Sequence, residues 1–218
     1  MNYLELLKLA SPEAIVAVTA LAVLAIGLAS GRETVAAAVS AAEPNPDAVA
    51  AATATTAPAS RICFLVTALG LALAIGAVLM LPQHATLFGG MLVITPLTSL
   101  FKIVCLALAF FTVLLARSDR ASRNHGEYLA MLLLATIGLM LLVGSEELLM
   151  IFIGLELTGL SLYVMTAFDK TDIRSAEAGL KYFLFGSTAS AFTLFGISFI
   201  YGMSGTTGLA AIGQKLTT

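Results

Sequence analysis

Two ionisable side chains stand within stretches that are otherwise apolar. Glu156 lies in "LLMIFIGLELTGLSLYVMTAF" (148–168), and Lys181 lies in "AGLKYFLFGSTASAFTLFGISFI" (178–200). A charge at the centre of a membrane helix costs about 2.5–3.5 kcal/mol, and such residues usually mark an ion pathway or a proton relay. A carboxyl and an amine can each take up and release a proton. The two residues therefore predict a proton relay, with a neutral, hydrogen-bonded structural acid as the alternative for Glu156.

The residues around Glu156 indicate that its segment is surrounded by protein. Small side chains share one face of the segment at helical spacing: Gly154, Thr158 and Ser161. Such seams let two helices approach closely. On a roughly opposite face, Glu156 lies beside Gly159 and Tyr163, so Tyr163 is a candidate supporting residue. We expect an interior helix of a bundle.

Lys181 has a structural interpretation of its own. Glu177 precedes it by four residues, in the favourable orientation for an intrahelical ion pair, and Thr188 shares its helix face. We take Glu177 and Thr188 as further supporting candidates. Glu156 should lie about 18 Å, and Lys181 about 8–9 Å, above the same membrane boundary at 1.5 Å per residue. We therefore expect no direct bond between them, but a water or a third group.

Composition places the chain among α-helical membrane proteins. Of its 218 residues, 59% are hydrophobic and 11% charged, and the mean hydropathy is +1.00, whereas a soluble domain carries about 25% charged residues. The fold class is an all-α, multi-pass transmembrane bundle, because its apolar runs are long enough to span a bilayer. We expect about six spans, over 13–29, 62–81, 97–116, 127–144, 148–168 and 176–202.

The domain organisation follows these spans. Residues 1–30 hold the first helix, for which a secretory signal peptide is the alternative. Residues 31–60 are rich in Ala, Thr and Pro and predict a flexible loop, and 61–218 form the main bundle. Residues 82–96 are predicted to form turns. Lys102 lies about one turn inside its span and is expected to snorkel outward.

Basic residues near the span ends predict the orientation. Seven Lys and Arg residues fall in the alternate loops 31–61, 117–126 and 169–175, against three on the other side. The positive-inside rule then places these loops in the cytoplasm and both termini outside.

Several chemistries have no support in the sequence. The net charge of −2 argues against a nucleic-acid partner. Cys63 and Cys105 fall in apolar runs and behave there as small hydrophobes, so neither a disulfide nor a metal site is expected. We expect no cofactor in this chain, because no glycine-rich fingerprint or cysteine cluster is present.

The part of the sequence that contains Glu156 and Lys181 resembles a known family. The stretch "EELLMIFIGLELTGLSLYVMTAF", followed by "RSAEAGLKYFLFGSTASAFTLFGISFIYGMSGTTGLAAI", is similar to the antiporter-like membrane subunits of respiratory complex I. The resemblance covers roughly residues 97–213. The resemblance implies a proton channel of an NADH-quinone oxidoreductase, an enzyme complex of the bacterial inner membrane. By this likeness Glu156 corresponds to the channel acid and Lys181 to the channel lysine.

The resemblance also implies the partners. Other membrane subunits and the lipid bilayer would surround the chain, while quinone and NADH would be handled by other subunits, leaving no redox site here. The family's next channel lysine and its second half-channel would lie beyond Thr218. We therefore expect an N-terminal portion, a truncated product or a piece of a split subunit. The alternatives are a subunit of a multisubunit cation/proton antiporter, or a chain with only a packing role.

Overall fold

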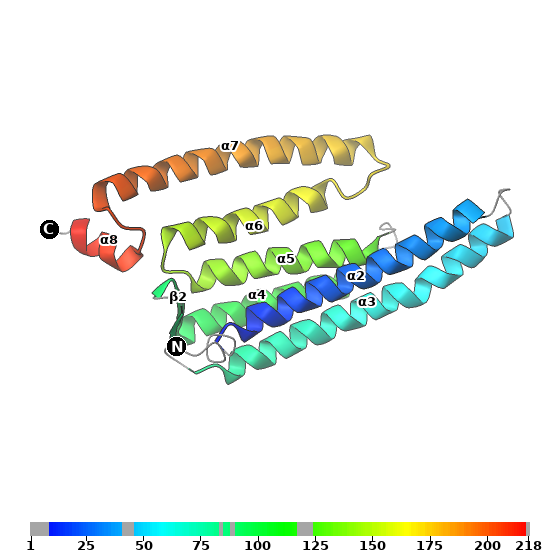
Figure 1. The fold of residues 1–218 in the computed structure, drawn as a ribbon, viewed down its shortest axis with the longest axis horizontal. Coiled ribbons are helices and arrows are strands. Elements are labelled where there is room, and N and C mark those ends of the chain that lie inside the picture. Colours follow the sequence, from blue (N-terminus) through cyan, green and yellow to red (C-terminus); the bar gives the residue numbers. More distant parts are fainter. Residues whose placement is uncertain (1–8, 41–45, 83–84, 88–89, 117–123, 217–218) are drawn as a thin grey trace.

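The structure is a computed structural model that describes residues 9–40, 46–82, 85–87, 90–116 and 124–216. This part of the chain is almost entirely helical (Figure 1). Its elements are α2 (Ser11–Ser40), α3 (Pro46–Met80), β1 (Ala85–Leu87), β2 (Leu92–Ile94), α4 (Pro96–Ala116), α5 (His125–Gly144), α6 (Leu148–Thr166), α7 (Ile173–Ser204) and α8 (Leu209–Leu216).

The all-α fold class and the six predicted spans are confirmed. Among the residues that the structure describes, six helical stretches are long and apolar enough to cross a membrane, namely Ser11–Ser30, Ser60–Met80 and helices α4, α5, α6 and α7. Their ends lie within a few residues of the predicted ones. Hydropathy predicts them well because about 20 apolar residues in helical geometry match the thickness of the hydrocarbon core.

Residues 31–60 were expected to form a flexible loop, but the described residues of this range are helical in the structure. Helix α2 continues to Ser40 and α3 already begins at Pro46, while residues 41–45 lie outside the described part. Alanine has the highest intrinsic helix propensity, and proline is well tolerated at a first helical position. The Ala-rich composition therefore extends both helices beyond their apolar spans.

Helix α5 lies at the centre of the bundle (Figure 1). More than half of its apolar window is buried, a larger share than in any of the other five candidate spans. It packs against α2, α3 and α4 on one side and against α6 on the other, and α7 packs outside α6. The core on the α2–α4 side includes fully buried Leu71, Leu106, Leu129, Leu133 and Met140.

Several short connections meet at one end of the bundle, which we call the hairpin end. The antiparallel pair β1–β2 lies here, where only turns are expected; its Leu92–Ile94 strand contains the β-branched residues that favour this conformation. Leu92 also bridges to Ser145, and Glu147 bridges to Gly208. Helix α7 ends here at Gly205, whose φ of 64° is the left-handed conformation that glycine adopts readily.

The opposite end carries the connection between α6 and α7, and we call it the loop end. The Asp169 carboxylate accepts hydrogen bonds from the Thr171 hydroxyl at 2.7 Å and the Thr171 amide at 3.0 Å. These bonds lower the pKa of Asp169. Asp172 then caps α7 by accepting from the Arg174 amide at 2.9 Å. The tight turn fixes α7 antiparallel to α6.

Candidate functional site

Glu156 lies at the contact between α6 and α7. It is half-buried, and its Oε1 accepts a hydrogen bond from the hydroxyl of Ser190 on α7. The same hydroxyl also lies 3.0 Å from the carbonyl oxygen of Gly186. The Ser190 side chain therefore has two acceptors within reach, one on each of the two helices.

The opposite face of α6 packs closely on α5, as the small-residue seam predicts. A Cβ added to Gly154 would lie 2.9 Å from the Gly138 carbonyl oxygen and 3.0 Å from the Leu142 nitrogen. The Thr158 hydroxyl lies 3.4 Å from the Ala135 carbonyl oxygen across the same contact. Helix α6 is thus placed between α5 and α7, and its carboxylate faces α7.

Tyr163 extends the α6–α7 contact toward the loop end. Its ring packs edge-on against Tyr182 at a centroid distance of 4.8 Å and against Phe183 at 5.9 Å. The phenol oxygen lies where a Cβ on Gly186 would stand, so a larger residue at this position would displace the Tyr163 ring. The tyrosine hydroxyl therefore lies next to Gly186, whose carbonyl oxygen accepts a hydrogen bond from the Ser190 hydroxyl.

Lys181 is not brought to Glu156. Its Nζ lies 2.5 Å from Glu177 Oε1 on the same helix, and both side chains are more than half exposed. The structure thus forms the intrahelical pair and agrees with the axial estimate that Glu156 and Lys181 do not bond directly. Thr188 donates to the Leu184 carbonyl oxygen at 2.8 Å, within its own helix.

The expectation that Lys102 snorkels outward is wrong. Lys102 is 6% exposed, and its Nζ lies 2.5 Å from Glu13 Oε1 on α2. Gly144 on α5 makes room for it, since a Cβ there would lie 3.4 Å from the Lys102 Cε and Nζ. The sequence signal was an acid in the first turn of one span and a base about one turn inside another span at the same end, and their separation of 89 residues hid the pair.

Two carboxylate oxygens near the hairpin end remain buried without a hydrogen-bond partner among the described residues. They are Glu13 Oε2 and Glu147 Oε2. The other oxygen of Glu147 accepts from the Thr207 hydroxyl at 2.7 Å, which ties the α5–α6 turn to the segment after α7. Glu147 therefore joins two segments at the hairpin end, a role that the sequence does not reveal.

Comparison with known proteins places this arrangement in a family. Residues 145–217, which carry Glu156, Ser190 and Lys181, match the family model described as NADH:quinone oxidoreductase/Mrp antiporter, transmembrane. Over 134 residues the chain is 40% identical to NADH-quinone oxidoreductase subunit N of Desulfovibrio desulfuricans, covering 61% of this chain and 26% of that protein.

Two further relatives cover almost the whole chain. NADH-quinone oxidoreductase subunit N 2 of Acidobacterium capsulatum is 36% identical over 222 residues, which cover 97% of this chain and 40% of that protein. A chain of respiratory complex I from Thermus thermophilus with bound aureothin matches at a TM-score of 0.66 and 27% identity, over 91% of this chain and 38% of that one.

The chain thus spans between a quarter and two fifths of the length of these relatives. Its six apolar helices and its bacterial relatives place it in the bacterial inner membrane as a multi-pass protein. Residues 145–217 thus belong to the NADH:quinone oxidoreductase/Mrp antiporter family of transmembrane segments, and by sequence and by fold the chain as a whole is similar to the NADH-quinone oxidoreductase subunit N proteins.

Proposed function

We propose that the chain is a proton-translocating membrane subunit of an NADH-quinone oxidoreductase, with Glu156 as the group that takes up and releases the proton. The observation that carries this proposal is the half-buried Glu156 carboxylate between two spans, hydrogen-bonded to Ser190. Quinone reduction and NADH oxidation belong to other subunits in this proposal, and other membrane subunits are the partners of the chain.

The hydrogen bonds of Ser190 suit a carboxyl group that changes its protonation state. With Glu156 ionised, Ser190 donates to the carboxylate. With Glu156 neutral, its own hydroxyl can donate to Ser190 Oγ, which in turn donates to the Gly186 carbonyl oxygen 3.0 Å away. Both states keep their hydrogen bonds without a shift of either helix, so neither state carries the cost of an unsatisfied buried polar group.

Lys181 is the second ionisable group of the proposed relay. It lies nine residues before Ser190 on α7, about 13 Å along the axis at 1.5 Å per residue. The Tyr163 hydroxyl, next to Gly186, lies between these levels. Tyr163 and Thr188 are therefore supporting groups for a hydrated path, and Glu177 positions the Lys181 side chain through the ion pair at 2.5 Å.

The direct test is the ratio of protons moved to NADH oxidised in membrane vesicles that contain the assembled complex. We expect Glu156→Gln to lower this ratio with assembly intact, because the amide cannot be ionised. Ser190→Ala should lower it less, and Thr193→Ala is the matched control, since its hydroxyl bonds only to Ala189 of its own helix in the described structure. An unchanged ratio in Glu156→Gln would leave the chain with a packing role.

A cation/proton antiporter subunit is the second candidate, because the description of the matching family includes the Mrp antiporters. The two functions differ in their energy source. Sodium-dependent proton movement without NADH oxidation, abolished by Glu156→Gln, would favour the antiporter.

A further inference from the structure

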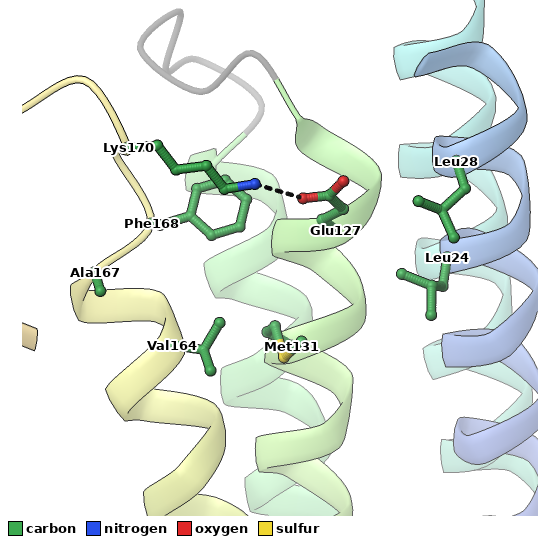
Figure 2. Close-up of a pocket in the computed structure, with 8 residues that line it drawn as sticks. All are labelled: Leu24, Leu28, Glu127, Met131, Val164, Ala167, Phe168 and Lys170. Atoms are coloured by element: carbon green, nitrogen blue, oxygen red, sulfur yellow. Dashed lines mark ion pairs between the residues drawn. The ribbon is translucent and has the colours of Figure 1, made fainter. Parts of the chain in front are cut away.

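A groove lies between α2, α5 and α6 at the loop end, away from the α6–α7 contact that holds Glu156 (Figure 2). Its volume is about 240 Å³, and it is lined by Leu24, Leu28, Glu127, Met131, Val164, Ala167, Phe168 and Lys170. Binding sites for drug-sized molecules usually enclose about 300–1,000 Å³. The groove is therefore too small for a large ligand, but it suits part of a hydrocarbon chain.

The walls of the groove are apolar along the spans. Leu24 and Leu28 come from α2, Met131 from α5 and Val164 from α6 (Figure 2). Leu28 and Val164 are 49% and 45% exposed, so the groove opens outward on the described surface. In a membrane-spanning bundle this open side faces acyl chains.

The mouth of the groove carries one charge of each sign. Lys170 Nζ lies 3.9 Å from Glu127 Oε2, and the two side chains are 77% and 30% exposed (Figure 2). Glu127 Oε2 also accepts from Asn124 Nδ2 at 3.2 Å. An exposed ion pair at this distance contributes only about 0–1 kcal/mol. Both groups therefore keep capacity for a ligand that carries a matching pair of charges.

The level of this mouth in the membrane is indicated by its neighbours. Lys170 lies in the connection that follows α6, four residues after Thr166, and Glu127 lies in the first turn of α5. Phe168 packs edge-on against Tyr128 at a centroid distance of 5.4 Å, and tyrosine is enriched at membrane–water interfaces. The charges thus lie at headgroup level, with the apolar walls running below them into the hydrocarbon.

We propose that this groove binds one phospholipid whose zwitterionic headgroup carries a phosphate and a primary ammonium. The phosphate binds Lys170, the ammonium donates hydrogen bonds to Glu127, and an acyl chain lies along Leu24, Leu28, Met131 and Val164. A headgroup with a quaternary ammonium has no N–H to donate to Glu127. An anionic headgroup without an amine offers no ammonium to Glu127, and its negative charge is repelled by the Glu127 carboxylate.

The test uses phosphatidylethanolamine with a photoactivatable diazirine in its acyl chain, added to the assembled complex after mild delipidation. We expect cross-links at the residues that line the groove, and we expect unlabelled phosphatidylethanolamine to compete at least tenfold better than phosphatidylcholine or phosphatidylglycerol. Lys170→Gln should lose most of the cross-linking. In Glu127→Gln, phosphatidylglycerol should compete as well as phosphatidylethanolamine, because the repulsion and the ammonium partner are both gone.

Two variants separate the site from its surroundings. Val164→Trp fills the groove and should abolish the cross-links, whereas Arg174→Gln removes an exposed basic residue at the same end that does not line the groove and should leave them unchanged. Equal competition by all three lipids in the wild type would overturn the proposal, because it indicates ordinary surrounding lipid. Cross-links that persist in Lys170→Gln, or their absence because another subunit fills the groove, would also overturn it.

Discussion

At the scale of single residues, two partly buried carboxyl groups within the spans have partners of different kinds. Glu13 forms an ion pair with Lys102, whose Nζ lies 2.5 Å from Glu13 Oε1. Glu156 faces only the hydroxyl of Ser190 among its described hydrogen bonds, and a hydroxyl can donate or accept. The Glu13–Lys102 pair is therefore suited to a fixed structural role, while Glu156 is suited to a change of protonation.

The structural role of Lys102 can be tested by removing its charge. Lys102→Met leaves the Glu13 carboxylate buried without a cation, and breaking a buried pair in this way costs about 3–5 kcal/mol. We expect a clearly lower thermal unfolding midpoint in detergent, partly restored in the double variant Glu13→Gln with Lys102→Met, where no buried charge remains.

Lys170→Gln is the control for this prediction, because the ion pair it breaks is largely exposed and should contribute about 1 kcal/mol at most. If Lys102→Met unfolds at the same temperature as Lys170→Gln, the Glu13–Lys102 pair does not stabilise the bundle.

At the scale of helices, α6 is held by two contacts of different chemistry. Glycine and threonine bring its backbone close to α5, where neighbouring helix backbones leave no room for a Cβ at Gly154. Toward α7 it presents Glu156 and the Tyr163 ring, which packs against Tyr182. The close α5 contact fixes the rotation of α6 about its axis, and this rotation directs the carboxylate at Ser190.

Glycine substitutions distinguish these contacts. In Gly154→Ala the new methyl group would lie about 3 Å from backbone atoms of α5, and such overpacking costs about 1–3 kcal/mol. We expect a loss of stability, measured as a lower unfolding midpoint. In Gly196→Ala nothing lies within 4 Å of the new methyl group, and the higher helix propensity of alanine should preserve or raise stability. Equal effects of the two substitutions would argue against the close contact.

At the scale of the whole molecule, the sequence predicts what depends on local patterns. The six spans follow from hydropathy, the orientation of α6 from its small-residue seam, and the Lys181–Glu177 pair from its spacing of four. The Glu13–Lys102 pair, the Ser190 partner of Glu156 and the β1–β2 hairpin were missed. The Glu13–Lys102 and Glu156–Ser190 contacts each join residues far apart in the chain, and only the packed bundle sets which helices are neighbours.

The orientation of the bundle in the membrane remains a prediction of the positive-inside rule. Single cysteines at Thr171, in the exposed α6–α7 connection, and at Gln214, on the exposed surface of α8, would report it in a chain whose Cys63 and Cys105 are replaced by alanine. We expect a membrane-impermeant maleimide to label Gln214→Cys from outside intact cells, and Thr171→Cys only after the membrane is opened. The reverse pattern would invert the topology.

The proposed function requires that Glu156 changes its protonation state when the complex works. Infrared difference spectroscopy of the assembled complex, recorded between the resting and the NADH-reduced state, detects the C=O stretch of a carboxyl group that gains or loses a proton. We predict a carboxyl band that disappears in Glu156→Gln and shifts in Ser190→Ala, since Ser190 is its hydrogen-bond partner. A difference spectrum with the same carboxyl bands in wild type and Glu156→Gln would contradict the account.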